Sequence, residues 1–190
     1  MFDSDGLAER NLVEGRSCGA CNVCCVALTI KDPELQKAQG YRCGHARRDN
    51  SCAIYATRPQ TCRTFHCGWR LLKWLREPLR PDRSGVLVRI SGGKPEPGEA
   101  PRLGVVFTLL NKAALKADGL AESVAAAVAA GMPVFLGIPG PPGYTSAQGQ
   151  INAFLEHAVC TKDKAAVLRI LRELRAAGSS GPRTRIGVLS

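Results

Sequence analysis

The chain has 190 residues, a formal net charge of +10 and 45% hydrophobic residues, which is enough apolar material for one domain or for a small module joined to a larger one. The longest apolar stretch is interrupted by Glu122, Gly131 and Pro133, which argues against a membrane span. The first fifteen residues hold three acidic residues before any basic one and no apolar run of signal-peptide length, so we expect a cytoplasmic protein.

The basic excess, 26 Lys and Arg against 16 Asp and Glu, would by itself suggest a polyanionic partner. Aromatic residues make up 5% of the chain, however, and supply few side chains for stacking on nucleic-acid bases. Thiolates bound to metal would also offset part of the positive charge. We therefore expect metal ions, and in one interpretation a protein, as partners, whereas the composition disfavours nucleic acid.

The first informative stretch from the N-terminus is "CGACNVCC" at residues 18–25, which places four thiols within eight positions. Cytoplasmic thiols are kept reduced and nine cysteines are an odd number, so a disulfide framework is disfavoured and metal binding is favoured. The predicted metal ligands are the eight cysteines of residues 18–67: Cys18, Cys21, Cys24, Cys25, Cys43, Cys52, Cys62 and Cys67.

The spacing of these cysteines favours iron over zinc. Cys18, Cys21 and Cys24 form C-x2-C-x2-C, which opens the bacterial ferredoxin pattern and takes a fourth ligand from elsewhere. Structural zinc prefers two C-x2-C pairs, and the later cysteines do not supply a second one. We expect an iron–sulfur cluster, with four irons favoured, or else zinc. Two four-thiolate sites and one cluster with spare thiols both remain open.

Two histidines and one pair of cysteines complicate the predicted ligand set. Adjacent Cys24 and Cys25 have side chains that diverge in most backbone conformations, so they either serve different metals or one of them only packs. His45 and His66 are possible replacement ligands, although a solvated or core histidine is the commoner case. We expect the isolated Cys160 to be a small core residue.

Composition changes near residue 85, so the sequence predicts a cysteine-rich module (residues 1–85), a second layer (86–178) and a frayed tail (179–190). Frequent Gly, Pro, Asn and Asp indicate little regular structure in the cysteine-rich module, which would be organised around metal. Its last segment, "GWRLLKWLRE" at 68–77, is the exception, because its apolar residues recur at helical spacing.

The remaining elements predict an α+β fold. Two β-branched runs suggest an antiparallel hairpin over about 86–110, followed by an Ala-rich helix that Gly131 terminates and a short strand at 133–139. The segments 147–160 and 162–178 are expected to be helices, with Gly178 after the end of the second. Strand, strand, helix and strand in this order indicate a small sheet packed with helices.

Two cysteine boxes resemble the YkgJ-type family, the CxxCxxCC or putative zinc- or iron-chelating domain. The first box is "CGACNVCC", and the second is "CAIYATRPQTCRTFHC" at 52–67, with Cys43 between them. The matching positions of the second box are Cys52, Tyr55, Arg58, Pro59, Cys62, Arg63, Phe65 and Cys67. The resemblance covers about residues 17–90 and implies metal chelation by these cysteines. The first box is also similar to one in flagellin lysine methylases, with which an iron–sulfur cluster is associated.

Function beyond metal binding divides into two classes. The first is an iron–sulfur protein in electron transfer or protein modification, and the second is a zinc-stapled interaction module without catalytic activity. Arg58 and Arg63 could donate hydrogen bonds to metal-bound sulfur, and Tyr55 and Phe65 could cover the site. No phosphate-binding loop and no Ser-His-Asp set stands out, so the sequence names no reaction and leaves open whether the chain is an enzyme.

Overall fold

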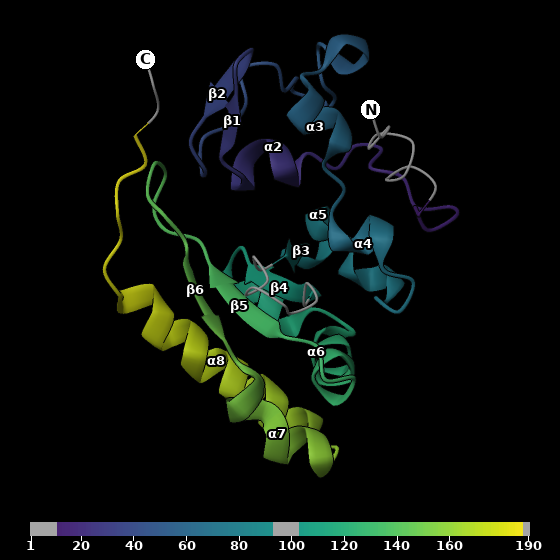
Figure 1. Ribbon diagram of the computed structural model, residues 1–190, viewed down its shortest axis with the longest axis vertical. Coiled ribbons are helices and arrows are strands. Elements are labelled where there is room, and N and C mark those ends of the chain that lie inside the picture. Colours follow the sequence, from purple (N-terminus) through teal and green to yellow (C-terminus); the bar gives the residue numbers. More distant parts are fainter. Residues whose placement is uncertain (1–10, 93–102, 188–190) are drawn as a thin grey trace, which may run out of the picture.

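The computed structural model describes residues 11–92 and 103–187 and confirms the α+β class. Figure 1 shows the cysteine-rich module, coloured purple to blue, at one end of the molecule. A four-stranded sheet lies in the middle, and two C-terminal helices lie at the far side of it.

Short elements make up the described part of the cysteine-rich module, as its composition predicts. They are helix α2 (Val23–Ala27), strands β1 (Ile30–Asp32) and β2 (Leu35–Lys37), the 3-10 turn η1 (Tyr55–Thr57) and helix α3 (Gln60–Thr64). The two strands pair in antiparallel fashion, and Asp32 at the end of β1 accepts hydrogen bonds from the amide and hydroxyl of Thr61 in α3. This contact fixes α3, which carries Cys62, beside the small hairpin.

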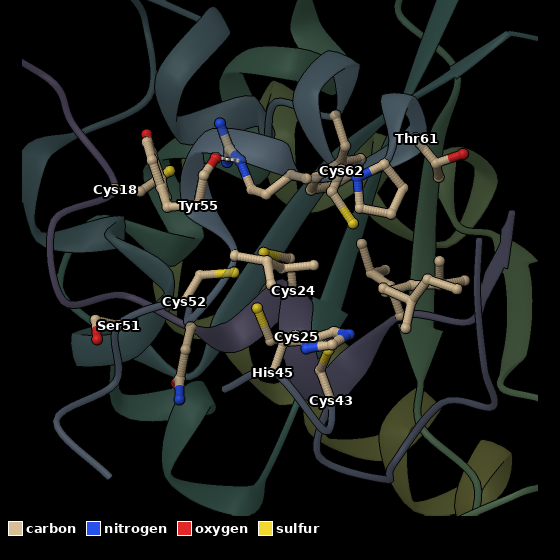
Figure 2. A pocket seen from close by; sticks show the side chains of 18 of the residues that line it. Cys18, Cys24, Cys25, Cys43, His45, Ser51, Cys52, Tyr55, Thr61 and Cys62 are labelled. Atoms are coloured by element: carbon tan, nitrogen blue, oxygen red, sulfur yellow. Dashed lines mark hydrogen bonds between the residues drawn. The ribbon is translucent and has the colours of Figure 1, made fainter. Parts of the chain in front are cut away.

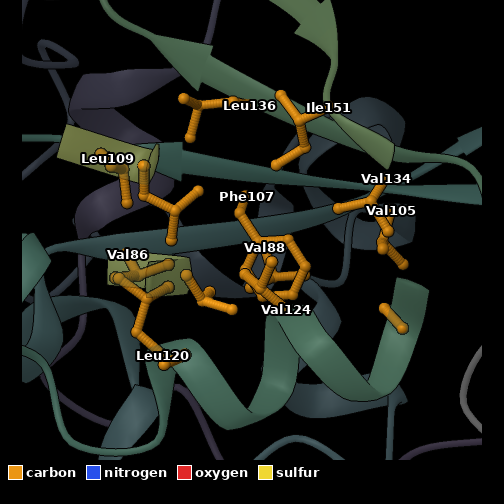
Figure 3. Packing of buried hydrophobic residues seen from close by; sticks show 14 of the residues in the cluster. Val86, Val88, Val105, Phe107, Leu109, Leu120, Val124, Val134, Leu136 and Ile151 are labelled. Atoms are coloured by element: carbon orange, nitrogen blue, oxygen red, sulfur yellow. The ribbon is translucent and has the colours of Figure 1, made fainter. Parts of the chain in front are cut away.

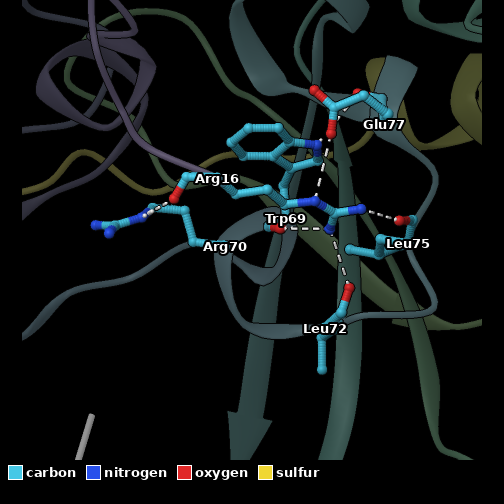
Figure 4. Close-up of polar contacts among 6 residues, drawn as sticks. All are labelled: Arg16, Trp69, Arg70, Leu72, Leu75 and Glu77. Carbon is cyan, nitrogen blue, oxygen red and sulfur yellow. Dashed lines mark hydrogen bonds and ion pairs between the residues drawn. The ribbon is translucent and has the colours of Figure 1, made fainter. Parts of the chain in front are cut away.

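The segment expected to be a helix over 68–77 is helical for one turn. Helix α4 (Gly68–Leu71) stops there, and η2 (Glu77–Leu79) and α5 (Pro81–Ser84) follow after a turn. Figure 4 shows the reason: the guanidinium of Arg16 donates to the carbonyls of Trp69, Leu72 and Leu75, at 2.7, 3.2 and 2.6 Å. A cation from a distant segment thus satisfies carbonyls that a longer helix would have bonded internally.

The sheet has the order β3-β4-β5-β6. Its strands are β3 (Val86–Gly92), β4 (Leu103–Leu109), β5 (Val134–Ile138) and β6 (Ala147–Gln150). β3 and β4 are antiparallel, as predicted, with Val88 opposite Phe107, whereas most of the loop that joins them, 93–102, lies outside the described residues. β5 pairs parallel to β4 and antiparallel to β6. The sequence had predicted helix for the four residues of β6.

The helices differ from prediction at two glycines. The Ala-rich helix is divided into η3 (Lys112–Lys116) and α6 (Leu120–Ala129), because Gly119 adopts a left-handed conformation with φ of 81° between them. After α7 (Asn152–Cys160), helix α8 (Lys164–Ser180) continues through Gly178 rather than ending before it. A Cβ at Gly178 would collide with Ile138 Cδ1, so this glycine permits close packing of α8 on β5.

The hydrophobic core lies between one face of the sheet and helices α6, α7 and α8 (Figure 3). Phe107 is fully buried at its centre, with Val88, Val124 and Leu136 around it. Trp69, Leu75 and Leu79 belong to the same cluster, so the core crosses the predicted boundary at residue 85. At the crossing point Gly68 lies against Val88, where a Cβ would approach within 2.7 Å of Val88 Cγ1.

The C-terminal residues up to 187 are held by the rest of the fold, in contrast to the expected frayed tail. Arg185 forms an antiparallel bridge with Tyr144, and the amide of Ile186 donates to the carbonyl of Gly143 at 2.7 Å. The amide of Gly143 in turn donates to the carbonyl of Gln39 in the cysteine-rich module at 2.9 Å. The loop before β6 therefore connects the tail to the module.

We predict that Arg16→Met lowers the free energy of unfolding by about 3 kcal/mol, because it leaves three carbonyls without their charged donor. The Arg16 side chain is 11% exposed and also forms an ion pair with Glu77 at 3.4 Å. Urea denaturation followed by tryptophan fluorescence measures the change. Arg169→Met is the matched control, since Arg169 is 60% exposed and should contribute less than about 0.5 kcal/mol. Equal losses from the two variants would contradict the role of Arg16.

Candidate metal centre

Seven of the eight clustered cysteines line one cavity of about 270 Å³ beside α2 and α3 (Figure 2). They are Cys18, Cys21, Cys24, Cys25, Cys43, Cys52 and Cys62. The eighth, Cys67, precedes the first residue of α4 and is packed against the main core. All nine cysteines of the chain are free thiols, so the fold holds no disulfide framework.

Backbone hydrogen bonds bring these cysteines together from separate segments. The amide of Cys21 donates to the carbonyl of Cys18 at 2.8 Å, which closes a turn just before α2. The amide of Cys43 donates to the carbonyl of Cys25 at 2.9 Å, and an antiparallel bridge between Ala46 and Cys52 closes the next loop. The thiols are therefore presented by tight, hydrogen-bonded turns.

Arg70 is the arginine that reaches a cysteine sulfur in the described part of the chain. Its Nη1 lies 3.8 Å from Cys18 Sγ and 3.1 Å from His66 Nδ1, and its backbone amide donates to the carbonyl of Cys67 at 2.9 Å. Sequence reasoning missed this residue. The available signal was its position three residues after Cys67, which places it on the first turn of α4 beside that cysteine.

Lys37 is a second cation that the sequence did not single out. The residue is 7% exposed, and its Nζ donates to the carbonyls of Val26, Leu28, Ala38 and Tyr41 at 2.6 to 3.1 Å. Burial lowers the pKa of Lys37, whereas the nearby cysteines, with Cys43 first, act in the opposite direction. The Lys37 ammonium group is therefore held close to the thiols of Cys43 and Cys25.

Two arginines were predicted to act on the metal site. Arg58 lines the cavity, and its Nε donates to the Tyr55 carbonyl at 3.0 Å while its guanidinium stacks 3.8 Å from the centre of the Tyr55 ring. With φ of −54° and ψ of 142°, Arg58 is extended before Pro59, as predicted. Arg63 is exposed in the last turn of α3. The proposed roles of both toward metal-bound sulfur stay predictions.

The aromatic residues and histidines occupy different positions around the site. Phe65 lines the cavity, and so does Tyr55, although 61% of Tyr55 is exposed, which leaves it at the outer edge. His45 lines the cavity as well, whereas His66 contacts Arg70. Cys160 is exposed on α7, so the expectation that it is a core residue was wrong.

The cysteines differ in their tendency to ionise. Burial raises the pKa of Cys21, Cys62 and Cys67. The hydrogen bond between Cys24 and Cys25 raises the pKa of Cys24 and lowers that of Cys25 to about 6, and Lys37, Arg42 and Arg58 also favour the Cys25 thiolate. These adjacent thiols interact with one another, in contrast to the divergence expected from their sequence positions.

The donor set fits a thiophilic metal, although the sulfurs do not converge on one point. Within residues 11–92 and 103–187, no group of three or more His, Cys, Asp or Glu side chains is close enough to hold a single ion. The thiols instead surround a larger space. A change of rotamer moves a cysteine sulfur without moving its backbone, so the turns that carry these residues need little rearrangement to bind metal.

Searches against protein-family models, curated proteins and solved structures found no match to this chain. Among the described helices, none combines the length and apolar composition needed to cross a bilayer.

We predict that Cys25 of metal-free protein is alkylated by iodoacetamide with a rate that rises through about pH 6 and levels off above pH 7, because the thiolate is the reacting form. Free cysteine, with a pKa of about 8.5, is the reference and should still gain rate up to pH 9. Mass spectrometry of the labelled peptide gives the rate at each pH. A profile for Cys25 that follows free cysteine would contradict the assignment.

Proposed function

We propose that this chain binds a metal centre through its eight clustered cysteines and that the centre is iron–sulfur rather than zinc. The observation that carries the proposal is the cavity lined by seven of these cysteines, with Cys67 next to it in space through Arg70. The two cysteine boxes that resemble the YkgJ-type family support the same conclusion from the sequence. Seven reduced thiols around one cavity, with an eighth beside it, have no comparable purpose in packing.

The size of the cavity supports a cluster over a single zinc ion. Zinc binds four thiolates at about 2.3 Å, which requires the sulfurs to converge on one point. The thiols here surround about 270 Å³ instead, and this space suits a cofactor of several atoms or more than one centre. The C-x2-C-x2-C spacing of Cys18, Cys21 and Cys24 favours iron for an independent reason.

The protein's own residues would hold the centre and balance its charge. The eight cysteines supply thiolate ligands, and an iron–sulfur cluster, when bound, supplies one-electron transfer. Arg70 beside Cys18 and Lys37 beside Cys25 and Cys43 place positive charge where thiolates accumulate. The site is therefore suited to electron transfer or to a modification reaction that uses electrons.

Protein purified without oxygen tests this proposal directly. We expect brown protein that contains iron and acid-labile sulfide. Colourless protein with stoichiometric zinc would instead support the zinc-stapled interaction module. Protein that stays metal-free after reconstitution with iron and sulfide and after incubation with zinc would overturn metal binding altogether.

We also predict that Arg70→Gln lowers the reduction potential of the bound centre at unchanged metal content, because it removes a positive charge next to Cys18. A tenfold change in the redox equilibrium would correspond to about 60 mV. Arg70→Lys should restore part of the shift. Arg63→Gln is the matched comparison, since Arg63 is exposed and its substitution should have a smaller effect. Potentiometric titration of the three variants measures these shifts, and equal potentials for Arg70→Gln and the wild type would refute the role of Arg70.

A further inference from the structure

We propose that the eight cysteines form two separate four-cysteine sites rather than one centre with spare thiols. The first site consists of Cys18, Cys21, Cys24 and Cys67, and the second of Cys25, Cys43, Cys52 and Cys62. This division rests on the proposed metal-binding function and adds to it the identity of each ligand set.

The first set is assembled from one turn and one distant helix. Cys18 and Cys21 belong to a single hydrogen-bonded turn, and Cys24 follows three residues later on α2. Cys67 joins them through Arg70, whose amide bonds to the Cys67 carbonyl and whose guanidinium reaches Cys18 Sγ. Cys67 is close enough to Cys18 and to Cys21 for the charges on their sulfurs to interact.

The second set is assembled around Cys25. Cys43 is hydrogen-bonded to the backbone of Cys25, and the loop after it returns to the bridge at Cys52. The charge on Cys62 interacts with those on Cys25, Cys43 and Cys52. In Figure 2 Cys25, Cys43, Cys52 and Cys62 lie around one space, with Cys24 at its centre, whereas Cys18 lies to one side of it.

The two sets meet at the adjacent residues Cys24 and Cys25. The thiols of these two residues interact with each other, so the two proposed sites would adjoin here. Cys24 interacts electrostatically with Cys18 and Cys21 as well as with Cys25. We assign it to the first set because it completes C-x2-C-x2-C. Two-cluster ferredoxins divide a cysteine run in the same way, since the fourth cysteine of the run binds the other cluster.

The distribution of cations agrees with two centres. Four thiolates around a divalent ion or a four-iron cluster retain net negative charge, which nearby cations must stabilise. Arg70 serves the first set at Cys18. Lys37, held by four backbone carbonyls, interacts with Cys43, Cys25 and Cys62 of the second set and also with Cys24. Arg70 and Lys37 therefore place positive charge beside both proposed sites.

Substitutions that combine members of the two sets test this division. In full-length protein reconstituted without oxygen, Cys67→Ser and Cys52→Ser should each retain about half of the wild-type metal. The double variant Cys18→Ser/Cys67→Ser should lose no more than Cys67→Ser alone, because both residues belong to one site. Cys52→Ser/Cys67→Ser should retain little metal, and Cys160→Ser should retain all of it. Metal analysis and native mass spectrometry give the counts.

Alkylation mapping gives a second readout that does not depend on total metal content. In reconstituted Cys67→Ser, iodoacetamide should label Cys18, Cys21 and Cys24, while the second set stays protected. Labels that cross the two sets, or four dispensable cysteines among the eight, would overturn the division. Loss of all metal from Cys67→Ser alone would overturn it too, because it indicates one shared centre. Wild-type protein that binds no metal would instead refute the proposed function itself.

Discussion

The guanidinium of Arg16 is the interaction on which the arrangement of the cysteines depends. It binds the carbonyls of Trp69, Leu72 and Leu75 and thereby attaches the segment before the first cysteine box to the segment after Cys67. The amide of Val13, which donates to the Arg70 carbonyl at 2.7 Å, strengthens the same attachment. Cys18 and Cys67 are 49 positions apart in the sequence, and they become neighbours because these two segments run together.

Buried cations replace apolar packing in this part of the molecule. Within residues 11–67, few apolar side chains are buried, Ile30, Ala38 and Cys43 among them, and this is too little surface to order the loops by the hydrophobic effect alone. The ammonium group of Lys37 instead binds four carbonyls from two segments, residues 26–28 and 38–41. Such bonds are strong because the donor is charged and shielded from water. The loops are thus organised by polar contacts, and a bound metal would add to them.

The sequence predicts elements whose pattern is local and misses those that depend on distant contacts. The hairpin of β3 and β4 and the termination of α6 at Gly131, with φ of 70°, follow from β-branched runs and from the conformational freedom of glycine. β6 was missed because "AQGQ" is polar and has no strand pattern. It is a strand because its backbone pairs with the edge of β5. Gly178 was misinterpreted for a similar reason, since its packing partner Ile138 is far away in the chain.

In the candidate site, too, the sequence predicts what depends on local spacing and misses what depends on distant contacts. The cysteines could be identified from spacing, because C-x2-C-x2-C is a property of one short loop. The cations beside the cysteines could not be predicted, because Arg70 and Lys37 are positioned by carbonyls and thiols of other segments. The interaction between the thiols of Cys24 and Cys25 was likewise not predicted, because it depends on how α2 presents both side chains to one cavity.

The contact of residues 143–145 with both Gln39 and the C-terminal residues has a consequence for any dissection of this protein. The carbonyl of Gln39 accepts from the amide of Gly143, and its side chain bonds to Tyr144 and Ser146. Residues 184–186 hold the same loop through backbone hydrogen bonds and the bridge at Arg185. The loop that contacts Gln39 of the cysteine-rich module is therefore itself held by the C-terminal residues 184–186. An excised fragment that ends at residue 85 would lose these partners together with the surface on which Trp69 packs, so it would not reproduce the native ligand geometry. Insertions should be better tolerated in loops that, unlike residues 143–146, are not hydrogen-bonded to two other segments.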